Sequence, residues 1–275
     1  MEIKIREVFH DKNPKLARLL PGFVYKYIEH IVHQDELNDI LKKHGHLVGI
    51  EFLQAALKEF NVKVEVRGIE NVPPNKRYLF VSNHPLGGFD GILLMNVILQ
   101  YFGSVKVMVN DILMNIKNLE PMFLPINKHG GNSKVAAIAI DEAFGSGTHI
   151  LTFPAGLCSR KRNGRIEDLE WKKNFISKAV SSKRDIVPVF FSGKNSNFFY
   201  NLSKIRGTLG IKSNIEMFFL VDELFKHRNK TFTITFGKPL QSGLFNKNKT
   251  YIEWAGAIKR HVYKLEEDPS EIFFV

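Results

Sequence analysis

A histidine and an aspartate, His84 and Asp90, stand close together in the stretch RYLFVSNHPLGGFDG, residues 77–91, with five residues between them. An imidazole paired with a carboxylate is typical of a general base, because the acid orients the ring and fixes its tautomer. The same residues leave a structural alternative open. Asp90 would then be a helix N-cap, and His84 a partly buried loop histidine.

The elements around this pair indicate where it should lie. Residues 78–81 are an apolar, β-prone run, which predicts a buried strand that stops at Ser82. Pro85 ends the strand, and Gly87 with Gly88 frees the backbone for a tight path before a helix near residue 91. Since α/β proteins carry their chemistry on strand-to-helix loops, we expect the pair at the edge of a sheet.

The rest of the chain alternates between strand-like and helix-like segments. The predicted strands are residues 62–66, 78–81, 105–109, 122–126, 149–153, 186–191 and 231–236, and the predicted helices are residues 92–102, 133–144, 169–181 and 251–267. This order predicts an α/β fold, with a largely parallel central sheet flanked by helices.

The first 60 residues have a different pattern. Apolar residues at helical spacing predict two or three helices, one of which carries Phe23, Tyr27 and Ile31 on an apolar face. We therefore divide the chain into an N-terminal helical platform, residues 1–60, and an α/β domain, residues 61–275.

Two further loops carry positive charge after a predicted strand. In THILTFPAGLCSRKRNGR, residues 148–165, a turn at Gly156 precedes a group of cations, Arg160, Lys161, Arg162 and Arg165. Such a group suits a phosphate or carboxylate, and a solvated basic loop is the alternative. Lys128 lies in the second loop, PINKHGG, residues 125–131. Both loops should meet the His84 loop at one edge of the sheet.

The sequence motifs of several other kinds of catalytic or nucleotide-binding site are missing. The chain has no G-x-S-x-G elbow, no P-loop, no G-x-G-x-x-G and no H-E-x-x-H. Cys158 is the only cysteine, and nothing around it is typical of a nucleophile. His30 and His33 share a helix face, but further ligands at matching spacing are missing, so we expect no metal site.

The charge of the chain indicates which kinds of binding partner are favoured. Lys and Arg outnumber Asp and Glu by 39 to 28, and this net charge of +11 favours anionic partners. The basic residues are scattered without a nucleic-acid motif, so an anionic membrane or an acyl carrier is the better expectation.

The single cysteine and the absence of an apolar signal core at the N-terminus predict a cytoplasmic protein. The longest apolar segment, residues 92–102, is shorter than the roughly 20 residues that a spanning helix needs. We expect a protein that lies on a membrane without crossing it.

Four motifs, NHPLGGFD, FLPINKHG, FPAGLCSR and IVPVFFSG, resemble in this order the four blocks of the lysophosphatidic acid acyltransferase family, over roughly residues 60–240. The chain departs from the family pattern twice. Five residues instead of four separate His84 from Asp90, and Ala155 stands where the family usually has glutamate. These departures look more like the divergent branch that includes hemolysin-related proteins and O-acyltransferases for bacterial aminolipids, such as lyso-ornithine and lyso-glycine lipids.

The resemblance implies an O-acyltransferase that moves a fatty acyl chain from acyl carrier protein or coenzyme A to the hydroxyl of a lysolipid. The acceptor would be a lyso-aminolipid or lysophosphatidic acid, met at the inner face of an anionic membrane, and no cofactor is implied. His84 would be the base and Asp90 its partner, while Arg160, and after it Lys128, would bind the acceptor's anion. Backbone N–H groups would stabilise the oxyanion, with three candidate glycines, Gly87, Gly88 and Gly156.

Two other functions stay open on the same fold. A non-catalytic lipid-binding protein is favoured by the extra residue between His84 and Asp90. An acyl thioesterase would use the same base to activate water. Because Ala155 removes an anion from its loop, we expect a lyso-aminolipid to be acylated at least as well as lysophosphatidic acid.

Overall fold

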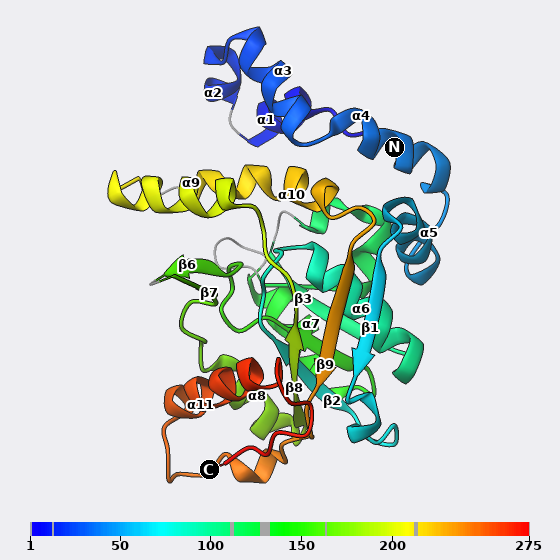
Figure 1. Cartoon of the computed structure of the whole chain (residues 1–275). Coiled ribbons are helices and arrows are strands. Elements are labelled where there is room, and N and C mark those ends of the chain that lie inside the picture. The colour runs from blue at the N-terminus through cyan, green and yellow to red at the C-terminus, as the bar shows by residue number, and fades with distance from the viewer. Residues whose placement is uncertain are drawn as a thin grey trace. The chain divides into compact units, whose positions relative to one another are not determined.

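The computed structural model describes residues 2–12, 14–110, 113–126, 133–162, 164–211 and 214–274. It consists of two compact units (Figure 1). Unit 1 contains Met1–Val62 and Asn195–Lys230, and unit 2 contains Lys63–Lys194 and Thr231–Val275.

The sheet of unit 2 has seven strands. Their spatial order is β1 (Lys63–Arg67), β9 (Thr231–Phe236), β8 (Asp185–Phe191), β2 (Tyr78–Ser82), β5 (His149–Thr152), β3 (Val105–Val109) and β4 (Phe123–Pro125). The five strands from β8 to β4 are parallel to one another. β1 and β9 are parallel to each other, and β9 is antiparallel to β8. The prediction of a largely parallel sheet is confirmed.

Helices cover both faces of this sheet because alternate residues of each strand point to opposite sides. On one face, Leu79 and Val81 pack in a core with residues of α7 (Ser133–Gly145), α8 (Asn174–Ser182) and α11 (Tyr251–Lys264). On the other face, Tyr78 and Phe80 meet Phe102 at the end of α6 (Phe89–Phe102), with ring centroids 6.4 and 5.4 Å apart. β2 is therefore buried on both sides, which explains its continuous apolar sequence.

The basic stretch that was expected to be a loop forms a small hairpin instead. β6 (Arg160–Arg162) pairs antiparallel with β7 (Arg165–Glu167), and Arg160 is buried whereas Lys161 and Arg165 are exposed. The hairpin thus buries Arg160 and leaves the other three predicted cations, Lys161, Arg162 and Arg165, exposed.

Unit 1 is helical. Its described helices of the first segment are α1 (Ile5–Lys12), α2 (Pro14–Leu19), α3 (Gly22–Ile31), α4 (Gln34–His44) and α5 (Ile50–Phe60), and those of the second are α9 (Asn197–Thr208) and α10 (Leu220–Lys226). The predicted division at residue 60 placed the second segment in the α/β domain. It packs with the first because the His33 ring stacks on Phe225, with centroids 4.1 Å apart, and its Nε2 lies 3.1 Å from Asp222 Oδ1.

The predicted apolar face of α3 is exposed along only part of its length. Phe23 and Tyr27 are exposed, but Ile31 is buried, because it lies at the end of α3 where the chain turns toward α4. The three side chains therefore do not form one exposed stripe. Among the described residues, no helix is both long and apolar enough to cross a membrane.

Candidate active site

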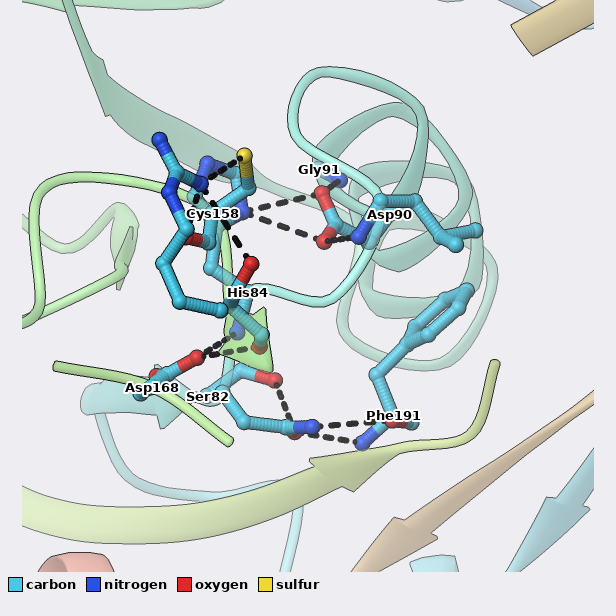
Figure 2. Close-up of polar contacts among 11 residues, drawn as sticks. Ser82, His84, Asp90, Gly91, Cys158, Asp168 and Phe191 are labelled. Atoms are coloured by element: carbon cyan, nitrogen blue, oxygen red, sulfur yellow. Dashed lines mark hydrogen bonds and ion pairs between the residues drawn. The ribbon is translucent and has the colours of Figure 1, made fainter. Parts of the chain in front are cut away.

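The chain leaves the sheet at Asn83, which ends β2 in a specific way. Its side-chain amide donates to the Phe191 carbonyl oxygen (2.9 Å), and its Oδ1 accepts from the Phe191 N–H (2.7 Å) (Figure 2). The amide thus pairs with the end of β8 as a backbone peptide would. The next residue, His84, is released from the ladder and is free to face the loop side of the sheet.

The structure brings His84 and Asp90 together. His84 Nδ1 lies 3.1 Å from Asp90 Oδ2 and 3.0 Å from Oδ1 (Figure 2). Asp90 is fully buried near the start of α6, where its Oδ2 also accepts from the Leu86 N–H (2.9 Å) and its Oδ1 from the Gly91 N–H (2.7 Å). Asp90 is therefore not the N-cap of the helix, a position that Gly88 occupies.

The five-residue interval closes because the loop folds back on itself at Gly87. The φ angle of Gly87 is 79°, a left-handed conformation that favours glycine over residues with a side chain. This turn allows the Leu86 N–H to reach the same carboxylate that His84 contacts. The extra residue thus leaves the contact between His84 and Asp90 intact.

The environment of the His84 ring suits a base. The ring is mostly buried and stacks on Phe153, with centroids 4.1 Å apart. Burial alone lowers the pKa of His84, but the Asp90 carboxylate, by its charge and hydrogen bond, and the Asp168 charge raise it above the ordinary value of 6.5. Asp90 thus orients the ring and strengthens it as a proton acceptor.

Asp168 holds the backbone of His84, and sequence reasoning did not single it out. Its Oδ1 accepts from the His84 N–H (3.1 Å) and from Ser159 Oγ (2.7 Å) (Figure 2). Its Oδ2 accepts from Trp171 Nε1 (2.8 Å). The Ser159 N–H in turn donates to the His84 carbonyl oxygen (2.8 Å). Both backbone groups of His84 are therefore bound by the segment that follows β5.

Asp168 is itself buried, and burial raises its pKa above the ordinary value, while hydrogen bonds from Ser159, the His84 N–H and Trp171 oppose that rise. Its three contacts are all with hydrogen-bond donors, which is the arrangement that an ionised carboxylate accepts. No local sequence motif predicts that Asp168 binds the backbone of His84, because the two residues are 84 positions apart in the chain.

A cavity of about 420 Å³ lies beside His84, within unit 2. Its walls come from α6, β3, β4, α7 and α8 and are mostly apolar, including Ile92, Met95, Val107, Val109, Leu113, Phe123, Ile140, Phe144 and Phe175. This volume lies within the range of roughly 300–1,000 Å³ that is usual for small-molecule sites. An apolar ligand can therefore reach the imidazole from inside the protein.

The predicted anion-binding side chains lie differently from the expectation. Arg160 is buried, and its Nη1 donates to the Cys158 carbonyl oxygen (2.7 Å), to Cys158 Sγ (3.0 Å) and to the Ser159 carbonyl oxygen (3.3 Å). It is not among the residues that line the cavity. Lys128 lies outside the described residues, so its predicted role stays a prediction.

Two lysines do line the cavity, and the sequence had not singled them out. Lys178 forms an ion pair with Asp141. Lys172 stands beside Gly156, where a Cβ on the glycine would lie 3.1 Å from Lys172 Nζ. Of the two lysines in the described cavity lining, Lys172 is thus the one beside Gly156, in the segment whose Ser159 N–H binds the His84 carbonyl oxygen.

The three glycines proposed as oxyanion donors also differ from one another. Gly88 and Gly156 line the cavity, and Gly87 does not. The Gly156 N–H donates to the Phe153 carbonyl oxygen (3.0 Å), so it is used within its own turn. Gly88 stands at the N-terminus of α6, where the helix dipole favours negative charge.

Comparisons with known proteins show which family the chain resembles. The model of a family described as acyltransferase matches residues 7–268. A lyso-glycine lipid O-acyltransferase of Bacteroides thetaiotaomicron is 49% identical over 264 residues, which cover 96% of this chain and 97% of that protein. A protein of the same name from Phocaeicola vulgatus is 48% identical and covers 96% and 95%.

One solved structure is similar at a lower level. The 1-acyl-sn-glycerophosphate acyltransferase PlsC of Thermotoga maritima is 18% identical and covers 90% of this chain and 95% of that one, with a TM-score of 0.45. This likeness is too distant to support a conclusion about the site.

Proposed function

The chain belongs to the acyltransferase family, and from this premise we propose that it moves a fatty acyl chain from an acyl thioester to the hydroxyl of a lyso-glycine lipid. Membership confirms the resemblance that the four sequence motifs indicated. The observation that supports the reaction most directly is the His84–Asp90 pair beside an apolar cavity. A base and an apolar site are the two things that acyl transfer to a hydroxyl requires.

In the proposed reaction, His84 Nε2 takes the proton of the acceptor hydroxyl while the oxygen attacks the thioester carbonyl carbon. Asp90 accepts from His84 Nδ1–H, which keeps the proton off Nε2 until the attack and stabilises the imidazolium afterwards. The tetrahedral intermediate then collapses, so that the C–O bond stays and the C–S bond breaks. The imidazolium returns the proton to the leaving thiolate, and no enzyme side chain is acylated.

The base accounts for only part of the rate. General base catalysis contributes roughly 10²–10⁴-fold, so the developing oxyanion must also be stabilised. We assign this role to the N-terminus of α6 at Gly88, which lines the cavity together with His84. Gly87 shapes the loop, and Gly156 is a weaker candidate because its N–H is already bound.

The cavity is proposed to hold the acyl chain of the donor. Its lining side chains from α6, β3 and α7 offer apolar contact along the chain, and His84 lies where the thioester would stand. Sheltering the chain from water favours binding of the donor, because burial of each methylene contributes about 0.8 kcal/mol. Acyl carrier protein and coenzyme A both remain candidates for the thiol partner.

The head group of a glycine lipid offers a carboxylate, and we propose Lys172 as its partner. The lysine lines the cavity beside Gly156. Ala155, which is buried in the same turn, places no anion there to repel the carboxylate. Arg160 and Lys128 stay proposed contacts of the acceptor, although Arg160 is held by the backbone of its own segment.

The acceptor also implies a place in the cell. A lysolipid resides in a membrane, and a basic protein, with +11 over the chain, is attracted to an anionic leaflet. We propose peripheral attachment at the cytoplasmic face of the membrane.

The reaction is tested with purified protein, an acyl thioester and two competing acceptors, a lyso-glycine lipid and lysophosphatidic acid, with products measured by mass spectrometry. We expect the acylated glycine lipid, and its loss in His84→Ala. The matched control is His46→Ala, because His46 is an exposed histidine of unit 1.

Three outcomes would contradict the proposal. Turnover by His84→Ala near the wild-type level would refute the base. Exclusive use of lysophosphatidic acid would refute the acceptor. Release of free fatty acid at the same rate with and without acceptor would identify a thioesterase.

A further inference from the structure

Helix α9 has an apolar stripe that faces solvent. Phe198, Leu202, Ile205 and Leu209 recur at i, i+4, i+7 and i+11, which places them on one side of the helix. Three of them are strongly exposed: Phe198 by 50%, Ile205 by 57% and Leu209 by 68%. Phe198 also touches Phe219 of unit 1, with ring centroids 5.0 Å apart, whereas Ile205 and Leu209 are the more exposed end of the stripe.

The buried face of α9 is a different one, and it is anchored by polar contacts. Phe199, Tyr200 and Ser203 are the buried residues of the helix. At its end, Arg206 Nε lies 2.8 Å from the fully buried Glu216 Oε2. The helix thus buries aromatic side chains and an ion pair inside unit 1 and, in addition, has apolar side chains on its exposed side, where a helix in contact with water alone usually has polar ones.

The start of α9 is equally fixed. Ser196 caps the helix by accepting from the Phe199 N–H (3.3 Å), while its own hydroxyl donates to Glu223 Oε1 (2.6 Å). Because both ends are held by α10 and the segment before it, the exposed stripe is a stable feature of unit 1. Unit 1 can therefore present the stripe without refolding.

The charges around the stripe indicate what covers it. From Asn195 to Ile211, within unit 1, the chain contains two basic residues and no acidic one. Lys204 is exposed and lies on the polar side of α9, next to the stripe, with Asn201. An apolar stripe bordered by a lysine and by no carboxylate fits a lipid surface with anionic head groups, since the apolar side chains enter the acyl boundary and the ammonium group meets the phosphates.

We propose that α9 is an interfacial helix, through which unit 1 binds an anionic lipid surface by Phe198, Ile205 and Leu209. The choice of a lipid as the occupant rests on the proposed function, because the acceptor resides in a membrane. The stripe belongs to unit 1, whereas the cavity and His84 belong to unit 2. The platform predicted at residues 1–60 stays a separate prediction.

The test is sedimentation of the full-length protein with vesicles of phosphatidylglycerol and phosphatidylcholine that contain no acceptor. We expect the double variant Ile205→Ser/Leu209→Ser to bind at least about tenfold more weakly than wild type, because two exposed apolar side chains lose their burial. The proposed reaction is then measured with a donor and an acceptor in detergent micelles, where both proteins should work equally well. Vesicle binding and acceptor identity are measured separately, so the proposal for α9 and the proposed reaction can each be refuted without the other.

The matched control is Ile252→Ser/Ile272→Ser, which removes two side chains of similar exposure, 53% and 56%. Ile252 lies in the first turn of α11, and both residues belong to unit 2. The control should bind vesicles as wild type does. Equal binding by the α9 variant, or equal loss in the control, would overturn the proposal. A wild-type dimer that the α9 variant converts to a monomer would assign the stripe to a second copy, and would overturn it as well.

Discussion

The substitution Asp168→Asn separates the structural role of this residue from its effect on the base. Asp168 accepts from the His84 N–H, Ser159 Oγ and Trp171 Nε1. An asparagine has one acceptor oxygen, so it keeps either the contacts on the His84 side or the contact with Trp171. On the other side the asparagine N–H group then faces a hydrogen-bond donor, and the negative charge is lost.

The size of the effect follows from these contacts. A hydrogen bond to a charged group contributes about 1.5–3 kcal/mol, and removal of the buried charge offsets part of the loss. We expect a net destabilisation of about 2 kcal/mol, which corresponds to a fall in Tm of roughly 4–8 °C for a chain of this size. If a similar energy positions His84 in the transition state, kcat falls at least about tenfold.

The pH profile gives the decisive readout. His84 must be neutral to act as a base, so kcat/KM falls as the pH drops through its pKa. The charge of Asp168 helps to raise that pKa, and its removal should move the acid limb to lower pH. Circular dichroism melting and kcat/KM between pH 5 and 9 measure both effects.

The matched control is Trp171→Phe, which removes the donor to Asp168 Oδ2 but keeps the charge near His84. It should lower the Tm and leave the acid limb in place. An unmoved acid limb in Asp168→Asn, together with a lower Tm, would show that Asp168 supports the fold alone and would refute this reasoning.

Three further predictions concern the same site. Asp90→Asn should lower kcat by roughly 10²–10⁴-fold and move the acid limb of kcat/KM to lower pH, because the Asp90 carboxylate raises the pKa of His84; a limb that stays in place would contradict this. Cys158→Ser should keep most of the activity, since the buried thiol accepts a hydrogen bond that a hydroxyl also accepts; an acyl group trapped on Cys158 by mass spectrometry would overturn direct transfer. Lys172→Met should raise KM for the acceptor more than for the donor, whereas Lys178→Met, which removes an ion-paired lysine, should not; equal effects in steady-state kinetics would exclude Lys172 as the head-group contact.

The central strands were predictable because burial on both faces leaves an unbroken apolar run in the sequence. The strand predicted at 105–109 coincides with β3, and the one at 231–236 with β9. Element ends were less accurate, as shown by the predicted helix 169–181, which begins only at Asn174. Trp171 is apolar and buried, but it serves as a partner of Asp168 rather than as a helix residue.

The pairing of His84 with Asp90 was also predictable, since both residues belong to one short loop. Asn83, Asp168 and Lys172 were not, because each acquires its role through a residue far away in the chain or through the shape of the cavity. The spacing of residues in the sequence predicts contacts within one helix, strand or loop, but it does not predict contacts between such elements. Helix α9 was missed because it has apolar residues on two faces, the buried Phe199 and Tyr200 and the exposed stripe, so that neither period stands out in the sequence.

The two segments of unit 1 have a consequence for how the protein is made. Met1–Val62 leaves the ribosome before Asn195–Lys230 exists, and the chain of unit 2 in between takes on the order of ten seconds to synthesise. During that time His33 lacks its later contacts with Phe225 and Asp222. The first helices therefore wait in an incomplete state, with apolar surface uncovered, while the sheet is still being extended. Synthesis that pauses before residue 195 would prolong this state and increase the need for a chaperone.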